Sequence, residues 1–161
     1  MAVLSFSGCA SKTPKPKFVD EKNEAKYAKS RAFDSPPEKV KMAARAVLDQ
    51  LTHASEPAAS ESVKEEENTL FTGWVYGVAK DKYVQYDYNG TPRRKPLSVR
   101  RIYGYKIEPS LSGSQVTMSV EEEIQEVDLS SGSPKGWKRM ETDPAAFDLL
   151  LRRLREQIRT Q

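Results

Sequence analysis

Two kinds of hydrophobic periodicity, at different places in the chain, most constrain how it can fold. Around residues 40–51 and 147–158, apolar residues recur every three to four positions, the spacing of one face of an α-helix. Between these stretches apolar and polar residues alternate, which is typical of strands with one buried face. The pattern predicts a helix over residues 36–52, three strands between residues 68 and 127, and a final helix that begins at residues 143–144.

Each predicted helix has a recognisable start and one apolar face. The first follows Ser35-Pro36-Pro37-Glu38, a capping box with proline in the first turn, and the last follows Asp143-Pro144. Arginines occupy the outer face of the last helix, mostly near its end, where cations interact favourably with the helix dipole. The expected apolar faces are Val40, Ala44, Val47, Leu48 and Leu51 in the first helix and Phe147, Leu150, Leu151, Leu154 and Ile158 in the last.

The predicted strands cover residues 68–78, 97–108 and 116–127, with a tight hairpin at residues 111–114 and a brief extra strand at residues 137–140. In the second strand Tyr103, Tyr105 and Ile107 point one way, whereas Arg100 and Lys106 point the other. We therefore expect a single small α+β domain in the order α-β-β-β-α, in which two helices pack on one face of a three-stranded antiparallel sheet.

Length and composition agree with one domain at residues 35–161 and a preceding tail. The chain has 161 residues, of which 37% are hydrophobic and 30% are charged, and its net charge is only +3. This composition provides no transmembrane helix in the body of the chain. The weak positive charge, which is not organised along a groove, argues against a nucleic-acid partner.

The chain has one cysteine, Cys9, preceded by Phe6-Ser7-Gly8. This run resembles the lipobox of bacterial lipoproteins, in which the cysteine becomes the lipidated first residue of the mature protein. The resemblance implies that residues 1–8 are the remnant of a signal peptide and that residues 9–34 are a lipidated cysteine and a flexible tether. Ala10 after the cysteine implies, by the same resemblance, a palmitate-bearing protein on the periplasmic face of the outer membrane of a Gram-negative bacterium. The alternative is a cytosolic protein with an incidental thiol.

The order of elements resembles the helix-grip domain of outer-membrane lipoproteins such as BamC of the β-barrel assembly complex. The resemblance is carried by the helix at residues 40–51, by Thr72-Gly73-Trp74, by Arg100-Arg101-Ile102-Tyr103, and by Trp137 ahead of the last helix. It implies a non-catalytic interaction module, with an accessory role in envelope or β-barrel assembly as one expectation. The chain has room for one such domain, whereas BamC has two.

Residues suited to catalysis are scarce. His53 is the only histidine, so a histidine cluster or a Cys/His dyad cannot form, and we expect no enzyme, no cofactor and no metal site. Glu121, Glu122 and Glu123 leave open a peptidoglycan-active enzyme with paired carboxylates, or a peptidoglycan-binding protein. Alternation along a strand puts Glu122 on the opposite face from the other two, which favours a solvated, charged strand instead.

The segment at residues 83–95 concentrates three tyrosines and three cations within thirteen residues. Tyrosine and arginine are typical anchors of protein interfaces. We therefore predict a contact surface for an envelope protein or peptidoglycan, consisting of Tyr83, Tyr86, Tyr88, Arg93 and Arg94. The alternative is a hairpin that turns at Asn89-Gly90 and packs its tyrosines on the sheet, with any binding surface on the outer sheet face beside Arg100 and Lys106.

Overall fold

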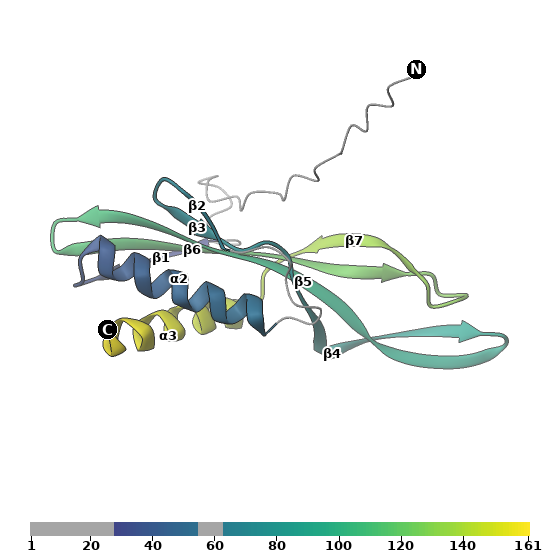
Figure 1. Cartoon of the computed structure of the whole chain (residues 1–161). Coiled ribbons are helices and arrows are strands. Elements are labelled where there is room, and N and C mark those ends of the chain that lie inside the picture. The colour runs from purple at the N-terminus through teal and green to yellow at the C-terminus, as the bar shows by residue number, and fades with distance from the viewer. Residues whose placement is uncertain (1–27, 55–62) are drawn as a thin grey trace, which may run out of the picture.

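A computed structural model describes residues 28–54 and 63–161, which form one antiparallel sheet with two helices on the same face (Figure 1). In chain order the elements are β1 (Ala28–Phe33), α2 (Pro37–His53), β2 (Lys64–Glu66), β3 (Thr69–Phe71), β4 (Val75–Tyr88), β5 (Thr91–Ser110), β6 (Gly113–Val127), β7 (Pro134–Met140) and α3 (Pro144–Thr160).

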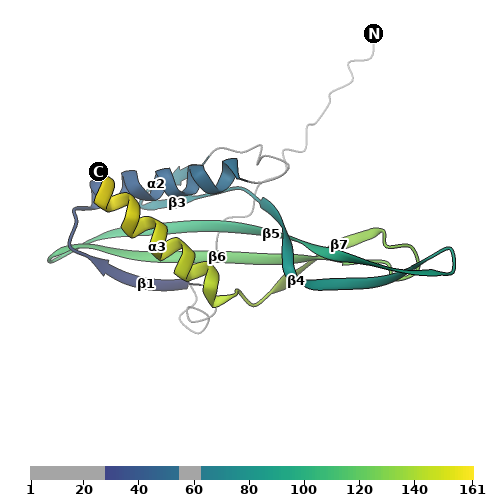
Figure 2. The same cartoon turned by 90° about the horizontal axis from the view of Figure 1, so that it is seen from below.

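The two longest neighbouring strands, β5 and β6, form the axis of the sheet and pair from Val99–Ile124 to Ser110–Gly113. The other edge of β5 pairs first with β4 and then with β3, and the other edge of β6 pairs with β1 and then with β7. The sheet therefore has two halves. One contains β1, β2 and β3 and is covered by the helices. The other, which we call the arm, contains β4, β7 and the adjoining parts of β5 and β6, and it extends past the helices (Figures 1 and 2).

The expected three-stranded sheet is wrong, because the described residues form seven strands. Residues 80–95, which lie between the strands predicted at residues 68–78 and 97–108, are instead the continuation of β4, a turn and the beginning of β5. The predicted strand at residues 68–78 is divided at residues 72–74 into β3 and β4. The two short strands β1 and β2 lie at edges of the sheet, where charged side chains are favoured over apolar alternation. Their sequences therefore carry no clear strand pattern.

Strand β1 also corrects the boundary of the expected tether at residues 9–34. Its residues Ala28 to Phe33 pair with Ser119 to Ser114 of β6, so they belong to the folded domain. Cys9 and the rest of the expected signal remnant and tether lie outside the described residues.

The hydrophobic core lies between the helices and the helix-covered half of the sheet, as the periodicity predicted. Phe147, Leu150 and Leu154 of α3 are buried, with Leu151 and Ile158 packed at the margin. The predicted stripe of α2 is buried as well, from Val40 to Leu51, and it faces Tyr103, Tyr105, Ile107, Val116, Met118 and Val120 of the sheet.

Hydrogen bonds at three buried or helix-terminal positions link the helices to the sheet or cap them. The Tyr105 hydroxyl donates to the carbonyl oxygen of Leu150 at 3.0 Å, and burial raises the pKa of Tyr105 above its ordinary value. The predicted cap of α3 is confirmed, since the Asp143 carboxylate accepts from the Ala145 N–H at 2.9 Å. The predicted Ser35 cap of α2 is wrong. Pro36 is the N-cap and makes no side-chain bond. The Ser35 carbonyl instead accepts from the Ser114 hydroxyl.

Candidate functional site

The outer end of the arm is a two-stranded ribbon that turns at Asn89-Gly90. Both residues have positive φ, 53° and 77°, as a two-residue hairpin turn that matches the strand twist requires. The Asp87 carboxylate accepts from the Gly90 N–H at 2.6 Å and closes the turn. The turn at Asn89-Gly90 that the alternative predicted is therefore confirmed, but the tyrosines Tyr83 and Tyr88 are not packed on the sheet as that alternative also predicted.

Side chains alternate between the two faces of this ribbon. After an irregularity in pairing between Val78 and Tyr83, Tyr83 stands opposite Pro96 and Tyr86 stands opposite Arg93. Because cross-strand partners share a face and neighbours along a strand do not, Tyr83 and Arg94 lie on one face. Tyr86 and Arg93 lie on the other, together with Tyr88.

Each of the two outermost arginines lies over a tyrosine ring. The Arg94 guanidinium is 4.0 Å from the centre of the Tyr83 ring, and that of Arg93 is 4.8 Å from the Tyr88 ring. Tyr83 and Tyr88 remain 48% and 47% exposed. Within residues 28–54 and 63–161 neither arginine forms an ion pair. Each guanidinium group thus contacts an aromatic ring, while both arginine side chains remain exposed to a partner.

Tyr86 has a different, structural role. An added Cβ at Gly132 would lie 2.6 Å from the Tyr86 ring, which shows how closely the ring covers the turn between β6 and β7. The Lys95 ammonium donates to the Gly132 carbonyl at 2.5 Å, and the Asp87 N–H donates to the Leu129 carbonyl at 2.8 Å. The predicted tyrosines therefore divide: Tyr86 packs within the arm, whereas Tyr83 and Tyr88 are on its surface.

The β6–β7 turn that supports Tyr86 is itself held by Asp128. Its carboxylate accepts from the hydroxyl and the N–H of Ser130, which lower the pKa of Asp128 to about 2, with a smaller contribution from Lys135. An ionised Asp128 thus orders the turn that contacts the ribbon.

The base of the arm holds an aromatic cluster around Arg100, which the sequence analysis did not identify as a unit. The Arg100 guanidinium lies 4.1 Å from the Trp74 ring centre and 4.5 Å from that of Trp137. Its Nε donates to the Glu123 carboxylate at 2.8 Å. Tyr76 completes the cluster by an edge-to-face contact with Trp137, at 6.0 Å between ring centres. These residues come from four strands and the segment before β4, so no local pattern connects them.

The run of three glutamates is engaged in ion pairs across strands. Glu123 pairs with Arg100, Glu122 with Arg101, and Glu121 with Arg139. Glu122 is opposite in face to the other two, as alternation predicted, but the expected solvated strand is wrong, because Glu121 and Glu122 are 7% and 3% exposed. Each carboxylate is matched by a guanidinium, so this run serves to join β5, β6 and β7.

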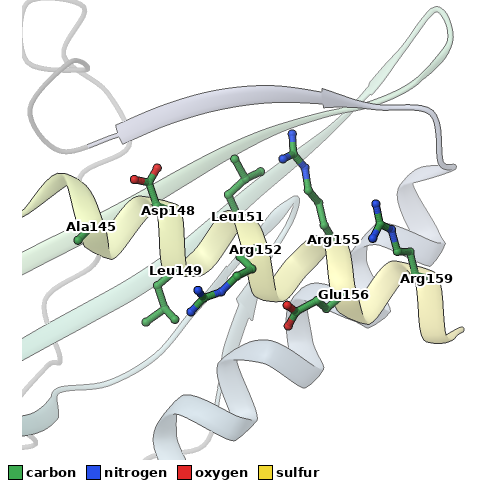
Figure 3. Close-up of a pocket in the computed structure, with 8 residues that line it drawn as sticks. All are labelled: Ala145, Asp148, Leu149, Leu151, Arg152, Arg155, Glu156 and Arg159. Carbon is green, nitrogen blue, oxygen red and sulfur yellow. The ribbon is translucent and has the colours of Figure 1, made fainter.

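Two of the hollows in the described residues lie outside the ribbon. One, of about 840 Å³, runs along the outer face of α3, and all its lining residues belong to that helix (Figure 3). The side chains of Arg155 and Arg159 point to one side of α3, whereas that of Arg152 points to the other, so these cations do not converge on one point (Figure 3). The second, of about 500 Å³, lies between β4 and the start of α3 above the Arg101–Glu122 pair. Its lining contains both basic and acidic side chains, with slightly more acidic ones, so it does not favour the binding of an anion.

In the part of the chain that the structure describes, no group of three or more His, Cys, Asp or Glu residues is placed to hold a metal ion. No helix there is long and apolar enough to cross a membrane. Known protein families and curated proteins were compared with the chain, and none matches it.

Proposed function

We propose that the protein is a non-catalytic interaction module of the bacterial envelope, anchored by a lipid on Cys9, which contacts a partner through the outer end of the arm. The surface consists of Tyr83, Tyr88, Arg93 and Arg94. Tyr86 is left out of it because its ring covers Gly132.

The observation that carries the proposal is the exposure of two tyrosines, each under an arginine, on an arm that extends beyond the core. Tyr103 and Tyr105, which pack in the core, are 5% and 0% exposed, whereas Tyr83 and Tyr88 are about half exposed. Their position outside the core means that they contribute little to packing against the helices. Large aromatic side chains and arginines in such positions are the residues on which binding energy concentrates.

The anchor is supported by the sequence around Cys9, in which Ser7 and Gly8 precede the cysteine. A lipid at this position holds the domain close to the membrane, so that encounters with an envelope partner occur at a high effective concentration.

Site-specific photo-cross-linking tests the contact surface in the living cell. The full chain, expressed behind a complete signal peptide in a Gram-negative host, carries p-benzoylphenylalanine at Gln85 or Thr91, both of which lie on the ribbon and are exposed. The matched control position is Met42 on α2, which is 66% exposed. A discrete cross-linked product from Gln85 and Thr91 but not from Met42 is expected.

Replacing Tyr83, Tyr88, Arg93 and Arg94 by alanine should abolish that product while the circular dichroism spectrum stays unchanged. Products from Met42 alone, or from all positions equally, would overturn the proposed surface. The anchor is tested separately: labelling with a radioactive fatty acid should be lost in Cys9→Ser, and labelling that survives would refute lipidation at this residue.

A further inference from the structure

The outer part of the arm carries a net positive charge. Residues 80–95 contain five lysines and arginines and two aspartates, whereas the whole chain contains 26 basic and 23 acidic residues. This segment therefore carries a net charge of +3 within sixteen residues. A partner of the arm should accordingly present negative charge.

We propose that the end of the arm inserts into a carboxylate-lined cleft of a protein partner, with Arg93 and Arg94 as its two anchors. The proposal rests on the function proposed above and adds the chemistry of the partner.

The Arg100 cluster within the same arm shows which ligand a stacked arginine takes. Arg100 lies between two aromatic rings and donates to Glu123 through Nε and Nη2, at 2.8 and 2.5 Å. Arg93 and Arg94 reproduce half of that arrangement: each has a ring at 4 to 5 Å, but no carboxylate from the described part of the chain reaches either of them. A partner's Asp or Glu would complete the same set of contacts, and the flat fork of a guanidinium suits two parallel hydrogen bonds to a carboxylate.

The geometry of the ribbon favours a cleft over a flat anionic surface. The Tyr83–Arg94 stack and the Tyr88–Arg93 stack lie on opposite faces of two paired strands. A lipid bilayer or a flat polymer touches one face of such a ribbon at a time, so one stack would remain unused. Only a groove with two walls can cover both faces together.

A fluorescein-labelled peptide of eight glutamates serves as the carboxylate probe, and its binding to the full chain is measured by fluorescence anisotropy at low and at physiological salt. The double variant R93Q/R94Q should bind about tenfold more weakly or worse, because each guanidinium loses charge-assisted hydrogen bonds. The matched control is R152Q/R155Q, which removes two exposed arginines of α3 that lie over no aromatic ring and, in the described residues, form no ion pair. It should change binding by less than about twofold, since residues 80–95 keep their charge.

Further variants separate recognition of carboxylates from attraction by charge alone. R93K/R94K keeps both charges but removes the planar forks, and it should still weaken binding by several-fold. R93Q and R94Q alone should each weaken binding, because both faces are used. Equal losses in R93Q/R94Q and R152Q/R155Q, or full binding by R93K/R94K, would refute anchoring by stacked arginines.

Sedimentation with phosphatidylglycerol vesicles tests whether the arm binds a membrane surface instead of a protein cleft. Strong vesicle binding that depends on only one of the two arginines would replace the cleft by a membrane surface. The two proposals also fail in different ways. If Gln85 and Thr91 cross-link to a partner but R93Q/R94Q alters neither the cross-links nor peptide binding, the arm is a contact surface without carboxylate recognition. If those positions give no cross-link, the proposed function itself fails.

Discussion

Replacing Gly132 by alanine should detach the β6–β7 turn from the ribbon and leave the helix-covered core intact. Gly132 has φ of +74°, and an added Cβ would lie 2.6 Å from two ring carbons of Tyr86 and 3.0 Å from a third. The substitution thus imposes backbone strain and also displaces the ring that covers the turn.

The free energy lost on substitution follows from the backbone strain and from the displacement of the Tyr86 ring. A left-handed backbone conformation costs an alanine about 1–2 kcal/mol relative to glycine. Movement of the Tyr86 ring also disturbs the neighbouring bond from Lys95 to the Gly132 carbonyl, which contributes about 1 kcal/mol. The closed arm should therefore lose about 2–3 kcal/mol relative to a locally opened arm.

Amide hydrogen exchange at Asp87 measures this opening, because its N–H donates to the Leu129 carbonyl only when the turn is closed against the ribbon. A loss of about 2–3 kcal/mol corresponds to exchange that is roughly 30- to 150-fold faster. Amides of α3 should keep their protection, since the core does not depend on the turn.

Two other glycines of the arm separate the cost of backbone strain from the cost of displacing the Tyr86 ring. Gly90 has φ of +77° but no atom within 4 Å of an added Cβ, so Gly90→Ala should show the strain term alone, about 1–2 kcal/mol. Gly136 has neither a positive φ nor a close neighbour, and Gly136→Ala should be neutral or slightly stabilising. If Gly132→Ala accelerates exchange at Asp87 no more than Gly136→Ala does, the turn does not hold the ribbon as described.

Three further predictions concern the core and the turn. Leu154→Ala should lower the free energy of unfolding in urea by about 2–5 kcal/mol, because Leu154 is fully buried, whereas Arg152→Ala should change it by less than about 0.5 kcal/mol; equal losses would mean that α3 packs differently. Tyr105→Phe should cost about 0.5–1.5 kcal/mol in the same assay, since its buried hydroxyl loses one hydrogen bond to a backbone carbonyl of α3, and no change would argue against that bond. The Asp128 carboxyl should titrate near pH 2 by carbon NMR and at a higher pH in Ser130→Ala, which removes the hydroxyl donor but keeps the N–H donor of residue 130 and Lys135. Because the folded pKa is the lower one, its stabilisation of the turn is complete above about pH 4 and disappears as the pH falls towards 2; a midpoint near 3.8 in the unmodified protein would contradict it.

The elements that the sequence predicted best are those determined by neighbours along the chain. Helices α2 and α3 begin within a residue of the predicted positions, α2 also ends within one residue of its predicted end, and the buried parity of β5 and β6 is as expected. The Asn89-Gly90 turn also follows from local backbone chemistry. Strands β1 and β2 escaped prediction, because an edge strand is stabilised by the hydrogen bonds of its neighbour and needs no apolar face of its own.

The candidate site was likewise only partly predictable from the sequence. The sequence by itself indicated that residues 83–95 concentrate tyrosine and arginine, but Tyr86 and Tyr88 look alike in it. Only the folded arm, which brings Gly132 against one ring and leaves the other exposed, decides which of the two packs and which is on the surface.

The partners of Arg94 and Arg100 also depend on the tertiary structure. By sequence alone Arg94, in the segment at residues 83–95, and Arg100, in the strand predicted at residues 97–108, both have aromatic residues nearby, and either could contact a partner. In the fold, antiparallel register puts Glu123 opposite Arg100, so that guanidinium is satisfied internally. Arg94 lies beyond the end of the pairing between β5 and β6, where no carboxylate of the described chain meets it. Periodicity, caps and turns depend on residues a few positions apart, so they can be predicted from the sequence. The partner of a charged side chain depends instead on the register between strands far apart in sequence, and this register exists only once the sheet has formed.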